Sequence, residues 1–185
     1  MSLFITHHRG KLQGIRSINV SPTTSIFCQH TALPICRKCY AKRILKTYGK
    51  KGIPHYEANA ELLKSPLRKF PHYKDAIFRF DSFGEIDTAE QLQNFYDIAA
   101  QNPNTRHALW TKRADLVAAN LIHPTNLNVI YGDPMIDNPS PQIPPGFDSI
   151  FSVFSTDDGV NCPKKCNSCR KCYEQRRLFI REKVK

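Results

Sequence analysis

The distribution of the seven cysteines constrains this chain more than any other sequence feature. They form an N-terminal group of three and a C-terminal group of four, with none between. An odd number of cysteines cannot pair completely as disulfides, and clustered thiols in a reducing compartment are more often metal ligands. The pattern therefore predicts one three-ligand site and one four-ligand site. The residues are Cys28, Cys36 and Cys39, then Cys162, Cys166, Cys169 and Cys172.

The rest of the composition is that of a globular protein. Of the 185 residues, 41% are hydrophobic and 23% are charged, which excludes a disordered or low-complexity chain. No apolar run approaches the ~20 residues that span a bilayer, and residues 1–9 lack a signal-peptide core. We therefore expect a cytoplasmic protein with no membrane partner.

Hydrophobic patterning predicts alternating strands and helices. An N-terminal hairpin is expected over 3–5 and 15–20. Further strands are expected over 76–80, 107–111, 127–131 and 150–154. The strand over 127–131 should end at Gly132-Asp133-Pro134. Helices are expected over 40–48, 56–63 and 114–119. Another helix is expected to begin at Asp87, which forms a capping box with Glu90.

This alternation indicates parallel βαβ units and an α/β fold. About five core strands are too few for a closed eight-stranded barrel, so we expect a partial, open β/α barrel, with a doubly wound sheet as the alternative. The β/α core with its cysteine loop is placed in residues 1–156. A metal-binding extension with four cysteines and a basic helix from about Tyr173 are placed in residues 157–185.

The N-terminal cysteines lie between a predicted strand and a predicted helix. Cys36 and Cys39 form a Cys-x-x-Cys pair, which lets two thiolates reach one metal centre. Three thiolates leave one corner of a cubane [4Fe-4S] cluster open for substrate or cofactor. If His30 joined Cys28, Cys36 and Cys39 as the fourth ligand, the four side chains would instead form a closed zinc site. The spacing leaves both alternatives open.

The C-terminal cysteines are separated by three, two and two residues. Four thiolates so close in sequence can surround one tetrahedral metal ion or one cubane. The spacing resembles that of ferredoxins, although compact zinc sites use similar steps. We therefore expect a second [4Fe-4S] cluster or a zinc ion there.

The order of strand, cysteine loop and helix resembles the start of the radical S-adenosylmethionine (SAM) superfamily, in which three cysteines bind a [4Fe-4S] cluster and SAM chelates the unique iron. The segment Cys36-Arg37-Lys38-Cys39-Tyr40-Ala41 and the strand end Trp110-Thr111-Lys112 are also similar to a family of uncharacterised bacteriophage proteins often catalogued as gene product 88. The resemblance implies catalytic roles for Cys28, Cys36 and Cys39, a reductant such as flavodoxin or ferredoxin, and a location in the host cytoplasm.

The segment after strand 76–80 is similar to the superfamily's Gly-Gly-Glu segment, which holds the amino group of SAM. Gly84 and Glu85 match it: a glycine permits close approach, and a carboxylate pairs with an ammonium group. If Phe78 and Phe80 face the helices, the residues that alternate with them point into the barrel. The candidate cofactor-binding residues are Tyr40, Arg79, Asp81, Ser82, Gly84, Glu85 and Lys112.

Two further polar residues should lie at the same mouth. Asp133 and Ser155 follow later strands, as Lys112 does, and ligands of open parallel sheets bind at the carboxyl ends of the strands.

The formal net charge of +11 indicates an acidic partner. Metal–thiolate sites lower this charge, but the excess still suits a phosphate backbone, so a nucleic acid or nucleotide is the expected substrate class. The alternatives are a non-catalytic zinc protein that binds nucleic acid, and a redox iron–sulfur protein without SAM chemistry.

Overall fold

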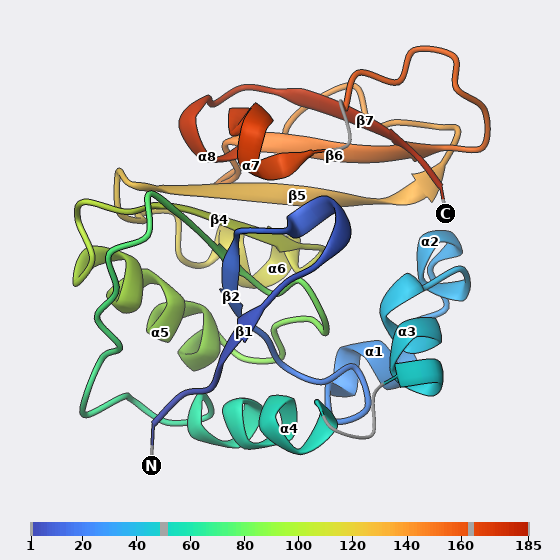
Figure 1. The fold of residues 1–185 in the computed structure, drawn as a ribbon. Coiled ribbons are helices and arrows are strands. Elements are labelled where there is room, and N and C mark those ends of the chain that lie inside the picture. The colour runs from blue at the N-terminus through green and yellow to red at the C-terminus, as the bar shows by residue number, and fades with distance from the viewer. Residues whose placement is uncertain (1, 49–51, 163–164, 185) are drawn as a thin grey trace.

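The computed structural model describes residues 2–48, 52–162 and 165–184. Its centre is a seven-stranded sheet whose strand order follows the sequence from β1 to β7 (Figure 1). β1 pairs with β2 antiparallel, and every later neighbouring pair is parallel. The strands are β1 (Ile5–His7), β2 (Arg16–Ile18), β3 (Ile77–Phe80), β4 (Arg106–Thr111), β5 (Leu127–Ile136), β6 (Ser149–Phe154) and β7 (Phe179–Lys183).

Most helices are short and connect successive strands. They are the 3₁₀ helix η1 (Gly10–Leu12) and the α-helices α1 (Ile26–His30), α2 (Pro34–Arg37), α3 (Tyr40–Tyr48), α4 (Ile53–Leu62), α5 (Ala89–Ala100), α6 (Ala114–Ala118), α7 (Cys166–Cys169) and α8 (Lys171–Glu174). The expected α3 matches residue for residue. The expected helix over 56–63 begins three residues earlier, with Pro54 in its first turn, a position that tolerates proline.

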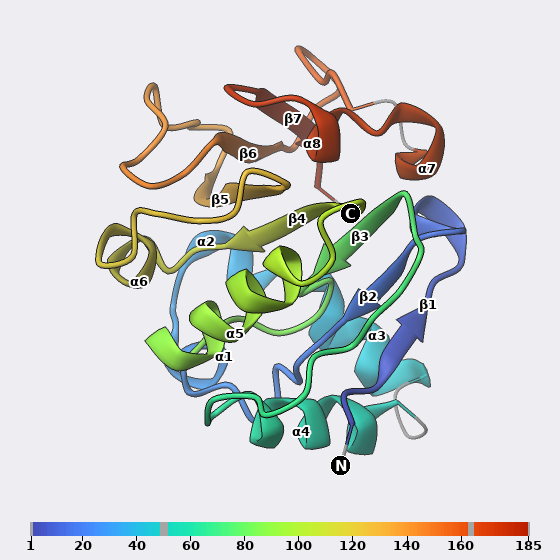
Figure 2. The ribbon, with the colours of Figure 1, turned by 90° about the vertical axis from the view of Figure 1, so that its left-hand side faces the viewer.

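The two faces of the sheet are covered by different parts of the chain. On one face, Phe78 and Phe80 of β3 pack with Phe95 of α5, and the rings of Phe80 and Phe95 stack with centroids 4.7 Å apart. On the other face, Ile77 and neighbouring strand residues pack against Tyr173 of α8. Figure 2 shows α5 and α8 on opposite sides of β4. The cysteine-rich tail is therefore part of the core packing on its face of the sheet.

The α/β class is confirmed, and the sheet is open within the described residues because β1 and β7 do not pair. A doubly wound sheet requires the strand order to reverse at a switch point. The order here runs without reversal, so that alternative is wrong.

Two expected boundaries in the second half are also wrong. β5 continues through Gly132-Asp133-Pro134 to Ile136, with a register shift against β6 that accommodates the proline. The basic helix expected from about Tyr173 is replaced by α8 and then β7, a parallel neighbour of β6. Ile180 of β7 is buried in the core. One buried apolar residue gives no periodic pattern in the sequence, so this strand could not be told from a helix.

The capping box is shifted by one residue. Thr88, rather than Asp87, is the N-cap of α5: its hydroxyl accepts a hydrogen bond from the backbone N–H of Gln91 at 3.1 Å. The Gln91 side chain in return accepts from the backbone N–H of Asp87 at 3.0 Å. The Asp87 carboxylate instead caps α1, accepting from the backbone N–H groups of Ile26 and Phe27, both at 3.0 Å.

Candidate functional site at the carboxyl edge of the sheet

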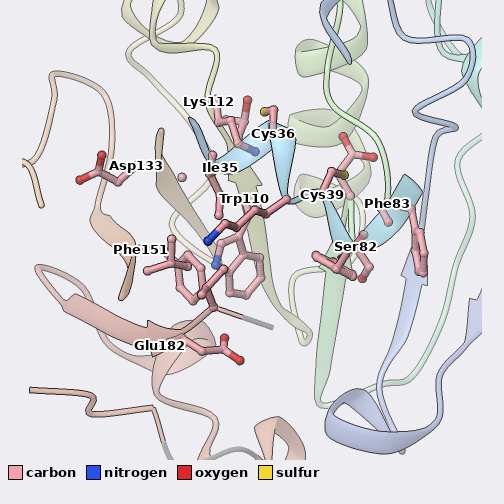
Figure 3. A pocket seen from close by; sticks show the side chains of 18 of the residues that line it. Ile35, Cys36, Cys39, Ser82, Phe83, Trp110, Lys112, Asp133, Phe151 and Glu182 are labelled. Carbon is pink, nitrogen blue, oxygen red and sulfur yellow. Dashed lines mark hydrogen bonds between the residues drawn. The ribbon is translucent and has the colours of Figure 1, made fainter. Parts of the chain in front are cut away.

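A cavity of about 190 Å³ lies at the carboxyl ends of strands β3 to β7, beneath α2 and the start of α3 (Figure 3). Its walls are largely apolar and include Trp110, Phe151 and Val153. Nine of the predicted polar and thiol residues line it: Cys36, Cys39, Tyr40, Arg79, Asp81, Ser82, Gly84, Lys112 and Asp133. Of the other predicted residues, Cys28, Glu85 and Ser155 are absent from its lining.

The N-terminal thiols lie in or beside three helices, and two of them, Cys36 and Cys39, reach the cavity. Cys28 lies in α1, Cys36 in α2, and Cys39 directly before α3. The Lys42 ammonium of α3 donates to the Cys28 carbonyl at 2.6 Å, which ties α3 to α1. Burial raises the pKa of the Cys28 thiol to about 12, although a hydrogen bond with Ser25 opposes this shift.

Lys112 carries a positive charge of the cavity wall next to Cys36 and Cys39. Burial acts to lower the pKa of its ammonium group, but Glu85 and all three N-terminal thiols act to raise it, and the net shift is upward. Its Nζ atom lies 3.6 Å from Oε2 of Glu85.

As they stand, the N-terminal thiols are not in a ligating arrangement. Within residues 2–48, 52–162 and 165–184, no group of three or more His, Cys, Asp or Glu side chains is placed to hold a metal ion. His30, the alternative zinc ligand, is exposed at the end of α1.

Glu85 lies behind the cavity wall and braces it. Its side chain is 2% exposed, and its carboxylate accepts hydrogen bonds from the Thr111 hydroxyl at 2.6 Å and from the Lys112 backbone N–H at 3.0 Å. Both carboxylate oxygens of Glu85 already have protein partners, so the side chain is not free for the expected contact with a cofactor ammonium group.

Gly84 is explained by packing against the end of β2. Its φ angle is +85°, and a Cβ atom there would lie 2.6 Å from the Val20 carbonyl oxygen. Only glycine fits this approach without displacing the backbone. The Tyr40 hydroxyl donates to the carbonyl of Ser82, so α3 is fixed to the same loop.

Arg79 and Asp81 point to the cavity, as the alternation with Phe78 and Phe80 predicts. The Arg79 guanidinium lies over the Trp110 ring, 3.8 Å from its centroid. Asp81 is 5% exposed, and neither of its carboxylate oxygens has a hydrogen-bond partner. Burial raises the pKa of Asp81 well above its ordinary value, and Glu85 acts in the same direction. The Val20 backbone and the positive charge of Arg79 oppose this shift.

The other two predicted polar residues have structural partners. Asp133 lines the cavity, but its carboxylate accepts from Ser140 N–H at 2.7 Å and from the Ser152 hydroxyl at 3.2 Å, which fixes the loop between β5 and β6 to β6 itself. Ser155 donates its hydroxyl to Asp137 at 2.6 Å, away from the cavity.

Sequence reasoning missed the contribution of β7 to this site. Glu182 and Lys183 line the cavity from the last strand, where a helix was expected. The parallel pairing of β6 with β7 brings them there, and no local pattern reports such a long-range pairing.

The C-terminal thiols gather on the opposite side of Arg79 and Trp110. All four, Cys162, Cys166, Cys169 and Cys172, line one small hollow of about 20 Å³ together with Tyr173. Burial raises the pKa of Cys172 to about 12, and the other three thiols act in the same direction. The Lys11 ammonium donates to Sγ of Cys162 at 3.2 Å, which anchors η1 to this thiol group.

Two aromatic rings in contact link the cavity to the hollow of the C-terminal cysteines. The Trp110 and Tyr173 rings meet edge to face with centroids 6.0 Å apart. Trp110 lines the cavity, whereas Tyr173 lines the hollow of the C-terminal cysteines.

Fold and site together define an α/β protein with an open, mostly parallel sheet and a cavity at its carboxyl edge. Comparisons with known protein families, with curated proteins and with solved structures find no match to this chain. Among the helices that the structure describes, none is long and apolar enough to cross a membrane.

Proposed function

We propose that this chain is a radical-SAM-like iron–sulfur enzyme in which Cys28, Cys36 and Cys39 hold a [4Fe-4S] cluster. The observation that carries the proposal is that Cys36 and Cys39 line one cavity together with Lys112. The rim lies at the carboxyl edge of parallel strands in sequential order, the arrangement that a partial β/α barrel has.

The donor set fits such a cluster in its chemistry. Three thiolates give a cubane three protein ligands and leave one iron open, and the Lys112 ammonium offsets their negative charge. The elements that carry Cys28 and Cys36 have no fully buried residue, so they can move toward Cys39 without disrupting the core. This movement is needed, because the thiols do not yet stand at ligating positions.

If bound, such a cluster would supply an open iron for SAM and, once a partner protein had reduced it, the electron for cleaving SAM into methionine and a 5′-deoxyadenosyl radical. The protein's part is to bind and enclose. Trp110, Phe151 and Val153 give the cavity apolar walls, while Tyr40 holds α3 over the loop after β3. A flavodoxin or ferredoxin is the proposed reductant, and the net charge favours a nucleotide or nucleic acid as substrate.

The C-terminal cysteines are proposed to hold a second centre. A hollow of about 20 Å³ exceeds the ~10–15 Å³ that one water needs, so it suits a single ion better than a cubane. This observation favours zinc at the second site and keeps a non-catalytic zinc protein that binds nucleic acid as the second candidate function.

Anaerobic reconstitution with iron and sulfide tests the proposal. We expect a brown protein with absorption near ~400 nm, and 5′-deoxyadenosine after reduction in the presence of SAM. Cys39→Ala should remove the cluster and leave the second centre, whereas Cys169→Ala should do the reverse. Zinc alone in both sites would support the second candidate. A colourless protein without bound iron would refute the first.

A further inference from the structure

The positive charge of the chain is concentrated near its start. Residues 1–56 contain ten lysines and arginines and not one aspartate or glutamate, so nearly all of the formal net charge of +11 arises there. A charge asymmetry of this kind between two parts of a chain is typical of a protein that binds a polyanion. The structure shows which of these cations remain available for a partner.

Two of these cations are neutralised within the fold. The Lys11 ammonium lies 2.5 Å from the Glu182 carboxylate, and the Arg16 guanidinium donates to Asp75 at 2.8 Å.

The cations of α2, of α3 and of the turn between them differ from these two. All five are exposed, and none forms an ion pair with a carboxylate within residues 2–48, 52–162 and 165–184. Like charges gathered on one surface repel one another, and a bound anion relieves this repulsion. We call this set the α2–α3 basic surface; its members are Arg37, Lys38, Lys42, Arg43 and Lys46.

The α2–α3 basic surface borders the cavity. Lys38 and Tyr40 line the cavity, and Figure 3 shows Cys36 and Cys39 of the same segment beside it. The Tyr40 hydroxyl donates to the carbonyl of Ser82, which fixes the start of α3 in this position. A polymer bound along α3 would therefore pass the mouth of the cavity.

Exposed apolar side chains accompany these cations and indicate the form of the polyanion. Ile26 of α1 is 67% exposed, and Tyr40 and Ile44 of α3 are 39% and 38% exposed. Unpaired bases have flat apolar faces that can cover such side chains, whereas in a duplex these faces are stacked inside the helix. The combination of exposed cations and apolar side chains therefore favours a single strand over a duplex.

The buried side of α3 argues against an anionic lipid surface as the partner. A helix that lies in a membrane interface inserts its apolar face among the acyl chains. In α3, the apolar residues Ala41 and Leu45 are only 4% and 7% exposed, because they pack into the protein. That face is not available to lipid.

We propose that the α2–α3 basic surface binds the phosphates of a single-stranded nucleic acid, so that the strand runs across the mouth of the cavity. The net charge alone indicates a class of partner, whereas the exposed cations on α2 and α3 define where it binds and in which form. The inference rests on the proposed function for any reaction that follows in the cavity, but binding itself requires neither a metal nor SAM.

The test uses the full chain as purified and a fluorescent oligothymidylate of about 16 nucleotides, the upper end of the usual site sizes. Binding is followed by fluorescence anisotropy between about 50 and 200 mM salt. Four or five phosphate contacts predict that the logarithm of the association constant falls with the logarithm of the salt concentration with a slope of about −3. A duplex of the same length should bind more weakly.

Two double variants separate this surface from general charge effects. Arg43→Gln with Lys46→Gln removes two contacts, so the slope should change to about −1.5 and the affinity near 50 mM salt should fall about tenfold or more. Arg68→Gln with Lys69→Gln is the matched control, because it removes the same two charges from another exposed pair. That pair follows Leu67, whose N–H donates to Asn94 of α5, and Figure 1 shows α5 and α3 on opposite sides of the molecule. The control should keep both the slope and the affinity, and circular dichroism establishes that each variant is folded.

The proposal is overturned if the oligonucleotide does not bind, if the two double variants weaken binding equally, or if the duplex binds as tightly as the single strand. Vesicles that contain phosphatidylglycerol test the lipid alternative, and binding to them without binding to the oligonucleotide would also overturn the proposal. Oligonucleotide binding in a chain that cannot be reconstituted with iron and sulfide would refute the proposed enzyme but keep this surface. A reconstituted cluster without oligonucleotide binding would do the reverse, so the two proposals fail separately.

Discussion

Glu85 accepts a hydrogen bond of 2.6 Å from the hydroxyl of Thr111, which joins the loop after β3 to the end of β4. The same carboxylate accepts from the backbone N–H of Lys112 and lies 3.6 Å from its ammonium group. The loop and the strand end therefore form one rigid corner of the cavity.

Replacing Glu85 should weaken this corner strongly. In Glu85→Gln, one carboxylate oxygen becomes an NH₂ group that faces donors, and the Lys112 ammonium loses its buried partner. We expect a loss of about 3 kcal/mol in the free energy of unfolding, measured with urea. Thr111→Val removes one hydroxyl and should cost only about 1–2 kcal/mol. Equal losses in the two variants would contradict the bracing role.

Gly84 should tolerate no side chain. Gly84→Ala places a Cβ atom 2.6 Å from the Val20 carbonyl oxygen at a φ of +85°, and we expect a loss of about 3 kcal/mol in unfolding free energy. Gly10→Ala is the control, because Gly10 also has a positive φ of +63° but nothing lies within 4 Å of its added Cβ. That variant should lose only about 1–2 kcal/mol. A mild effect at Gly84 would show that the loop can move away from β2.

Asp87 should control the exposure of Cys28. Ser25 is the N-cap of α1 and accepts from the Cys28 N–H, while Asp87 accepts from the Ile26 and Phe27 N–H groups. Asp87→Ala removes this second acceptor, so α1 should fray and Cys28 should react faster with a maleimide than it does in the unmodified protein. Thr88→Ala removes the cap of α5 at a cost of about 1 kcal/mol but leaves α1 capped. Its Cys28 should react at the unmodified rate, as followed by mass spectrometry of the labelled peptide. Faster labelling in both variants would mean that global unfolding controls access.

Trp110 should report metal binding at the C-terminal cysteines. Its ring contacts Tyr173, which lines the same hollow as those four thiols. Addition of Co²⁺ to reduced protein should quench the Trp110 emission and produce thiolate–cobalt absorption. Cys169→Ala should abolish the quenching. Cys39→Ala should keep the quenching. If Cys39→Ala abolished the quenching and Cys169→Ala did not, the ion would lie at the N-terminal thiols instead.

His107 should make stability depend on pH. Burial lowers the pKa of His107 to about 4, whereas in the unfolded chain it is close to the ordinary value of 6.5. The unfolded state therefore binds a proton first as the pH falls, and stability decreases between pH 6.5 and pH 4. The loss from this residue approaches about 3 kcal/mol. Ring signals in NMR spectra should stay constant down to about pH 5, and a His107 titration near 6.5 would contradict the lowered pKa.

Local patterns predicted the first half of the fold well. The α3 helix over residues 40–48 and the inward direction of Arg79 follow from short-range periodicity, and both are confirmed. β7 could not be predicted in this way, because its single buried apolar residue, Ile180, gains meaning only when β6 lies beside it.

The candidate site was predicted in its composition but not in the roles of its carboxylates. Sequence similarity favoured Glu85 for contact with a ligand, yet the fold turns that side chain toward Thr111 and leaves Asp81 facing the cavity. Likewise, Asp87 is adjacent to α5 in sequence but caps α1, some sixty residues earlier, with hydrogen bonds to Ile26 and Phe27. The direction of a loop side chain depends on tertiary contacts, which spacing does not encode.

The sequential order of the strands has a consequence for biosynthesis. A nascent chain can add β1 to β6 one after another as each emerges from the ribosome. The cavity wall formed by Glu182, Lys183 and Val184 is still inside the exit tunnel at that stage, because a tunnel encloses the last few tens of residues made. Completion of the cavity at this edge must therefore follow the synthesis of β7, and a chain that stops before β7 would have a sheet with an open pocket.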